Sequence, residues 1–236
     1  MKKNLILLRI IILLIGTSVF SQESSSNRVI DENTVGFIDD LTRGQIIGFR
    51  VKNKTKKEIL EGDKFLYKEW NNKLMLYTTD NKSYRFNNSN YDFVEDAFSI
   101  MISKDSVFNF NNDRIKFVRL NNKTFKKLVY KSTNHFYEVL TKGSISFYKR
   151  FTYKIRKGKV DPFSKEKISK DKIVMRKKYF ILKNNYLQEL RLKKNDLFKY
   201  FDDEKLNLIK RYAKENNLSC KKEKGVIKIL KYVNTL

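Results

Sequence analysis

The chain has 236 residues and a formal net charge of +25, from 51 Lys and Arg against 26 Asp and Glu. This length is enough to bury a core without disulfide support, and the single cysteine excludes an intramolecular disulfide. One histidine and one cysteine also exclude a His/Cys metal cluster within one chain, and no P-loop, G-x-S-x-G or H-E-x-x-H motif occurs. An all-carboxylate calcium site stays open. No other pattern indicates a site, so we predict no cofactor, metal or catalytic residue, and the pattern favours a non-enzymatic protein.

Residues 1–21 have the three parts of an export signal. Lys2 and Lys3 precede an apolar run from Leu5 to Ile15, and mostly small residues follow. The run has eleven residues, whereas a membrane span needs roughly twenty. We therefore predict a signal peptide that is cleaved after Ser21, not a membrane anchor.

The end of this segment, Val19-Phe-Ser-Gln22, resembles the cleavage sites of many exported proteins of Gram-negative bacteria. The resemblance covers only the first 22 residues and concerns the compartment alone. It implies a secreted, periplasmic or other cell-envelope protein. We expect no integral membrane span in the mature chain.

Residues 22–34 are rich in Ser, Asn, Asp and Glu, so we predict a flexible linker there. Residues 35–157 are predicted to form a β-rich domain. Short aromatic and β-branched runs alternate in it with Asn, Asp and Gly turns, which is typical of an antiparallel meander. Its longest predicted strand is Ser144–Ile155, in which Lys149 interrupts the alternation of apolar and basic residues.

Residues 158–176 are lysine-rich and contain the only proline, so we predict a basic loop or linker. Residues 177–236 are predicted to form a hairpin around the Asn184-Asn185 pair, followed by short helices with apolar residues at helical spacing. The predicted fold class is therefore α+β, with an antiparallel β-meander or sheet domain followed by a small helical C-terminal part.

The positive charge is concentrated in the second half of the chain. Met101 to Leu236 holds 36 basic and 13 acidic residues, whereas Asp31 to Ile100 holds 11 basic and 12 acidic residues. Such a field favours acidic partners, although an AT-rich genome also enriches lysine. If the charge is functional, we expect polyanion binding at six residues: Lys149, Arg150, Lys154, Arg156, Lys177 and Lys178.

Three isolated residues of interest have simple structural interpretations. We expect His135 to be a surface or hairpin histidine because no catalytic partner is recognisable near it in the sequence. We expect Cys220 to be a small buried side chain between two helices. Trp70, with Phe65 and Tyr67 before it, is expected to pack in a core.

Three function classes remain open at this point. The leading hypothesis is an exported envelope protein that acts as a non-enzymatic binding or scaffold module, with an envelope protein or an anionic polymer or lipid as its unidentified partner. The second is polyanion binding to anionic lipid, lipopolysaccharide or nucleic acid through the basic C-terminal half. The third is a hydrolase whose carboxylate site leaves no sequence pattern.

Overall fold

The computed structural model describes residues 27–29, 48–52, 60–104 and 106–236. The predicted signal peptide, residues 1–21, lies outside the described residues. Of the predicted linker, residues 22–34, only a short strand, β1 (Asn27–Val29), is described. The account below concerns the described residues alone.

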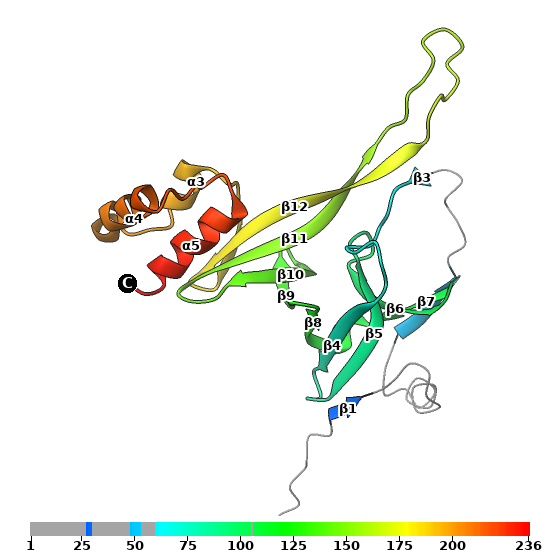
Figure 1. Ribbon diagram of the computed structural model, residues 1–236, viewed down its shortest axis with the longest axis horizontal. Coiled ribbons are helices and arrows are strands. Elements are labelled where there is room, and N and C mark those ends of the chain that lie inside the picture. Colours follow the sequence, from blue (N-terminus) through cyan, green and yellow to red (C-terminus); the bar gives the residue numbers. More distant parts are fainter. Residues whose placement is uncertain (1–26, 30–47, 53–59, 105) are drawn as a thin grey trace, which may run out of the picture.

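Most of the described chain belongs to one large, mostly antiparallel sheet (Figure 1). After β1 its strands are β2 (Gly48–Lys52), β3 (Leu60–Glu61), β4 (Asn72–Thr78), β5 (Ser83–Asp92), β6 (Ala97–Ser103), β7 (Ser106–Phe110), β8 (Ile115–Leu120), β9 (Lys123–Tyr130), β10 (Thr133–Thr141), β11 (Ile145–Arg156), β12 (Asp171–Lys183) and β13 (Tyr186–Leu190). Their order is β13-β12-β11-β10-β9-β8-β4-β5-β6-β7-β2, and β1 and β3 pair in parallel with β5 and β12. Two meanders, β4–β7 and β8–β13, are thus joined where β4 pairs with β8, which confirms the predicted antiparallel meander.

Three helices follow the sheet: α3 (Lys194–Phe198), α4 (Asp203–Glu215) and α5 (Glu223–Val233). Figure 1 shows them gathered at the end of the sheet where β11 begins. The apolar faces of α4 and α5 bury Ile209, Val226 and Leu230 in one cluster with Phe147 of β11 and Ile181 of β12. The predicted α+β class with a small helical C-terminal part is therefore confirmed.

Three apolar clusters hold the described residues together, and β11 contributes to all of them. Phe151 belongs to the largest cluster, which draws on β4 to β11. Phe147 belongs to the cluster under the helices. Tyr148, on the opposite face of the strand, packs with Tyr137 and Phe180. Because side chains alternate along a strand, β11 can serve cores on both of its faces.

The predicted hairpin around Asn184 and Asn185 is present between β12 and β13. Both residues have positive φ, 52° and 61°, which a tight two-residue turn requires and Asn tolerates. The strand before this turn begins earlier than predicted, because residues 171–176, assigned to the basic loop, are part of β12. The prediction failed there because apolar Val174 lies between Lys172 and Arg176, so the alternation of apolar and basic residues is incomplete.

Asn234, the residue after α5, ties the helical part to the turn between β10 and β11. Its Oδ1 accepts hydrogen bonds from the Ile145 N–H and the Ser144 hydroxyl, each at 3.0 Å. Its Nδ2 donates to the carbonyls of Ile145 at 3.0 Å and Lys142 at 3.3 Å. Gly143 leaves space for this side chain, because a Cβ at that position would lie only 2.3 Å from Asn234 Cγ. Its φ of +152° is also one that residues with a side chain rarely adopt.

We expect Asn234→Ala to lower the free energy of unfolding by about 2 kcal/mol, because the Ile145 N–H and carbonyl lose their partners. Denaturant unfolding of the two proteins measures this difference. Asn216→Ala is the matched control, since the Asn216 side chain bonds only to the Tyr212 carbonyl within the end of α4. Equal losses in the two variants would mean that Asn234 does not pin the helices to the sheet.

Candidate polyanion-binding surface

The β11–β12 hairpin carries the candidate site. Its strands pair without interruption from Ile145 and Lys183 at one end to Arg156 and Lys172 at the other. Figure 1 shows the hairpin running from the helices past β3 and beyond the rest of the sheet. Directly paired residues of antiparallel strands point to the same side, and side chains alternate along each strand. The register therefore decides which basic residues share a face.

One face of this hairpin, hereafter the basic face, gathers positive side chains from both strands. Arg150 pairs with Lys178, and Arg156 pairs with Lys172. The pairs between them are Thr152 with Arg176 and Lys154 with Val174. The basic face thus consists of Arg150, Lys154, Arg156, Lys172, Arg176 and Lys178. Successive positions on one strand of this face are about 6.6 Å apart, so the charges form a ladder along the hairpin.

Most of these charges have no acidic partner in the part of the chain that the structure describes. Lys178 Nζ lies 3.1 Å from Glu189 Oε2 on β13. The described residues contain no ion pair or hydrogen bond for the side chains of the other exposed members, which are Lys154, Arg156, Lys172 and Arg176. Because no neighbouring carboxylate neutralises these charges, they can attract an anion from solution.

Arg150 stands at the inner end of the basic face and is half-buried. Its Nε is buried and has no hydrogen-bond partner among the described residues. Burial raises the pKa of Tyr137 to about 12, and the nearby Arg150 charge opposes that rise. Arg150 therefore lies close to the apolar cluster around Tyr137, whereas the rest of the basic face extends away from it.

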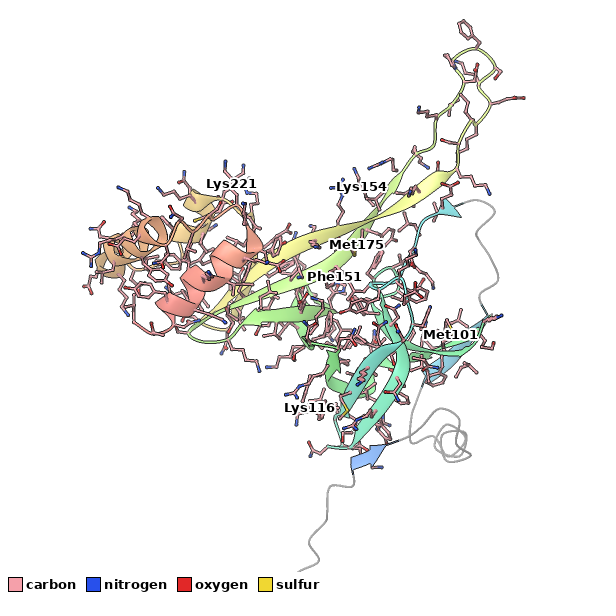
Figure 2. The ribbon with its side chains drawn as sticks, in the orientation of Figure 1. Met101, Lys116, Phe151, Lys154, Met175 and Lys221 are labelled. Carbon is pink, nitrogen blue, oxygen red and sulfur yellow. The ribbon has the colours of Figure 1, made fainter. Side chains whose placement is uncertain are left out.

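The opposite face of the hairpin is mostly apolar. Its inner part packs on the rest of the sheet, whereas Tyr153, Ile155 and Met175 farther out are exposed. In Figure 2 Lys154 lies on the outer side of the hairpin, and Phe151 lies on the side of the other strands. Phe151 is part of the largest core cluster, and Ile173 packs against that cluster. The hairpin is therefore amphipathic, with its basic face on the outside.

Two of the six residues predicted from the sequence do not join the basic face. Lys177 pairs with Phe151 and lies on the opposite, apolar face. Lys149 is only 4% exposed, and it also lies on that opposite face, directly across from Glu138 of β10. Arg150, Lys154, Arg156 and Lys178 lie together on the basic face.

Lys149 is held in a buried polar network between the two main cores. Its Nζ lies 2.8 Å from Glu138 Oε2 and 3.1 Å from both carboxylate oxygens of Glu223 on α5. Lys123 donates to Glu138 Oε1 at 2.8 Å, and the Tyr179 hydroxyl donates to Glu223 Oε2 at 2.9 Å. Burial, followed by the Glu223 carboxylate, raises the pKa of Tyr179. This network joins four strands to α5 and makes Lys149 unavailable to a ligand.

Sequence reasoning missed Lys172 and Arg176 because it placed both in the predicted loop. The residue numbers of Lys172, Arg176 and Lys178 differ by four and by two, and positions that differ by an even number lie on one face of a strand. That alternation was the signal that could have identified them. Their pairing partners on β11 could not be read from one strand alone.

Asp171 closes the strand pair where the hairpin tip begins. Its Oδ1 accepts the Gly158 N–H at 2.8 Å and lies 2.8 Å from Lys167 Nζ, and its Oδ2 lies 3.3 Å from Lys157 Nζ. The Gly158 hydrogen bond, then the Lys167 ammonium, hold the pKa of Asp171 far below its usual range. Asp171 therefore neutralises charge at the tip, through Lys157 and Lys167, and does not pair with a residue of the basic face.

His135 is half-buried and bonded to a carboxylate, not free on the surface. Its Nδ1 lies 2.8 Å from Asp96 Oδ2, and Asp96 Oδ1 also accepts the hydroxyl of Tyr91 and the N–H of Phe136 at 3.3 Å. Burial and then the Asp96 charge raise the pKa of Tyr91. The cluster links the β5–β6 turn to β10, which is a structural use for all four groups.

One cavity, of about 810 Å³, lies between the β9–β10 turn and the β12–β13 turn. Leu128, Tyr130, Leu182 and Leu187 line it, and Glu189 is its only carboxylate. The described residues hold no group of three or more His, Cys, Asp or Glu that could bind a metal ion. None of the described helices is both long enough and apolar enough to cross a membrane.

No protein-family model matches this chain, and neither a curated protein nor a solved structure matches it. The geometry of the hairpin therefore carries the functional argument on its own.

We expect Lys149→Met to lower the free energy of unfolding by about 3 kcal/mol, because buried Glu138 would keep only Lys123 as a cation and Glu223 would lose its ion pair. Denaturant unfolding at neutral pH measures the loss. Lys154→Met, on the exposed basic face of the same strand, is the matched control and should change stability by less than about 0.5 kcal/mol. A Lys149→Met protein as stable as the control would show that the buried ion pairs contribute nothing.

We expect Asp171→Ala to speed amide hydrogen exchange at Gly158 by about tenfold or more, since that N–H loses its acceptor. Glu166→Gln, at an exposed tip position, is the control and should leave this rate unchanged. In the wild type the folded pKa of Asp171 is depressed, so its stabilisation is complete above the unfolded pKa of about 3.9 and is lost progressively as the pH falls below it. An unchanged exchange rate at Gly158 in the alanine variant would contradict the hydrogen bond between the Gly158 N–H and Asp171.

Proposed function

We propose that this protein is a non-enzymatic binding module whose basic face holds a polyanionic ligand. The observation that carries the proposal is the alignment of Arg150, Lys154, Arg156, Lys172, Arg176 and Lys178 on one outward face of a hairpin. If the excess of lysine were only a result of genome composition, the lysines would be expected to scatter over the surface. A one-sided ladder of cations, of which only Lys178 has an acidic partner among the described residues, provides a directed field that attracts anions from solution and orients them.

The scaffold of the basic face suits a repeating anion better than a single small one. Its charges follow two long paired strands, and none of these six residues lines the cavity between the β9–β10 and β12–β13 turns. A small anion is recognised by convergent donors in a pocket, whereas a polymer or a charged surface can contact a row of cations. Anionic lipid, lipopolysaccharide and nucleic acid all present such rows of phosphates.

The cavity between the β9–β10 and β12–β13 turns, which is lined by apolar and polar side chains, favours a second, protein-binding role of the same module. Val129 and Tyr186, which line it, are 60% and 67% exposed. Exposed apolar side chains around a hollow are typical of protein interaction sites. The envelope scaffold hypothesis would use this cavity, and the polyanion hypothesis would use the basic face. The hydrolase hypothesis lacks such support, since Glu189 has no second carboxylate across the cavity.

Charge removal on the basic face tests the proposal, with a DNA duplex as a polyphosphate probe. We expect the variant Lys154→Gln, Arg156→Gln, Lys172→Gln and Arg176→Gln to bind much more weakly at low salt. Each lost phosphate contact removes about 0.9 from the slope of log affinity against log salt, so the slope should fall by about 3 to 4. Fluorescence anisotropy across a salt series measures both quantities.

A second variant with the same change of net charge serves as the control: Lys210→Gln, Arg211→Gln, Lys214→Gln and Lys228→Gln. These four exposed residues lie on α4 and α5, away from the basic face. We expect it to retain most of the wild-type affinity and salt slope. Equal losses in the two variants would mean that the total charge acts and that no site exists.

A further inference from the structure

The distal tip of the β11–β12 hairpin, residues 157–170, projects beyond the last paired residues, Arg156 and Lys172 (Figure 1). The tip is built as a continuation of the hairpin. The Ile168 N–H donates to the Lys159 carbonyl at 2.9 Å, and the Asp161 N–H donates to the Glu166 carbonyl at 2.8 Å. The tip therefore has a defined shape, and its side chains have defined directions.

Apolar side chains are exposed at this tip. Phe163 is 94% exposed, Ile168 is 63% exposed and Val160 is 52% exposed. Single exposed apolar residues are common on protein surfaces. Three of them within one projecting segment of fourteen residues, with an almost bare phenyl ring at its turn, point to contact with something apolar outside the chain.

The backbone N–H groups of residues 163–166 are bonded within the tip. Asp161 Oδ1 accepts the N–H groups of Phe163 and Ser164, each at 2.8 Å, and the Asp161 carbonyl accepts that of Lys165 at 3.0 Å. The Glu166 N–H donates to Ser164 Oγ at 3.3 Å, and Pro162 has no N–H. At these four turn residues no unpaired backbone N–H is carried into a less polar medium, which lowers the cost of leaving water.

Lysines surround the apolar residues of the tip. The segment contains five lysines, Lys157, Lys159, Lys165, Lys167 and Lys170, against two acids, Asp161 and Glu166. Lys157 and Lys167 are engaged by Asp171. Lys159, Lys165 and Lys170 have no acidic partner within the described chain. Lysine stems can pack along an apolar boundary while the ammonium groups stay among phosphates.

We propose that the hairpin tip docks in the headgroup region of an anionic lipid bilayer, with Phe163 inserted at the boundary of the acyl chains. This inference rests on the proposed function, because it names the polyanion as a lipid surface. The ionised Asp161 limits the depth, since a carboxylate is not carried into hydrocarbon. The tip lysines and the basic face behind them contact the lipid phosphates, as juxtamembrane basic segments do.

The distribution of aromatic residues favours a bilayer over single-stranded nucleic acid. Nucleic-acid grooves interleave stacking aromatics with cations along the same surface. On the basic face the positions between the cations are Thr152 and Val174. The exposed aromatic residues of the hairpin are Tyr153, on the other face, and Phe163, at the far end. An apolar group at the end of a basic arm fits a layered target, which has charge at its surface and hydrocarbon beneath.

The first test compares the wild type with Phe163→Ser on vesicles of phosphatidylcholine that contain phosphatidylglycerol as about one third of the lipid. We expect vesicle affinity to fall by about tenfold in the variant, because partial burial of one phenyl ring is lost. Affinity for the DNA duplex should be unchanged, since the basic face is intact. Both full-length proteins carry the same residues 1–21, so any contribution of that segment to vesicle binding cancels.

A second measurement reads the tip position directly. In Phe163→Trp combined with Trp70→Phe, the only tryptophan is at the tip, and its emission should shift to shorter wavelength when anionic vesicles are added. The wild type, with Trp70 beside Phe65 at a ring distance of 4.6 Å, is the matched control and should not shift. Vesicles of pure phosphatidylcholine should give no shift at the same concentration.

The outcomes separate the two proposals. An equal vesicle affinity for the wild type and Phe163→Ser, with no shift at position 163, overturns the bilayer inference but leaves polyanion binding intact if the duplex still binds. If the wild type binds neither the duplex nor the vesicles, both the polyanion proposal and the bilayer inference are overturned. A tenfold loss on vesicles alone, with the spectral shift, supports tip insertion.

Discussion

The register between β11 and β12 is the constraint on which the rest of the structure depends. It aligns twelve residues of β11 with twelve of β12, so each residue's face is settled at once. On one side the register delivers Phe147 and Phe151 to two different cores, and on the other side it delivers Tyr148 to the third. Beyond Tyr148 that second side becomes the basic face. A shift of one residue would expose the phenyl rings and bury the cations, so the hydrophobic effect maintains the basic face.

Lys149 makes this register more specific. It lies on the apolar face between Phe147 and Phe151, where a charge is costly unless it is paired. Glu138 and Glu223 supply that pairing from β10 and α5. A two-residue slip of β11 would keep the alternation but would carry Lys149 into an apolar cluster without carboxylates. The buried ion pairs therefore oppose the register errors that alternation alone would permit, and they also fix where α5 docks.

Charge and apolarity are separated along the hairpin in a way that fits an interface between water and lipid. The strand-borne cations are held by regular backbone pairing, so they lose little freedom when an anion binds. The tip has an exposed phenyl ring, Phe163, and Asp161 accepts the backbone N–H groups of Phe163 and Ser164. Electrostatic attraction acts at long range and weakens with salt, whereas insertion of a ring acts at contact and does not. The electrostatic term can therefore attract the protein to an anionic membrane, and insertion of the ring can hold it there.

The sequence by itself determined the fold class, the helical C-terminal part and the Asn184-Asn185 turn, because alternation, helical spacing and positive-φ residues are local properties. It also placed the positive charge in the second half of the chain. Only the tertiary structure decided which cations face outward. Lys149 looked like a member of the basic face, but its partner Glu223 is 74 residues away in sequence. Lys172 and Arg176 looked like loop residues until they were paired with β11. Side-chain direction in a sheet depends on long-range pairing and burial, and neither is encoded in a local stretch of residues.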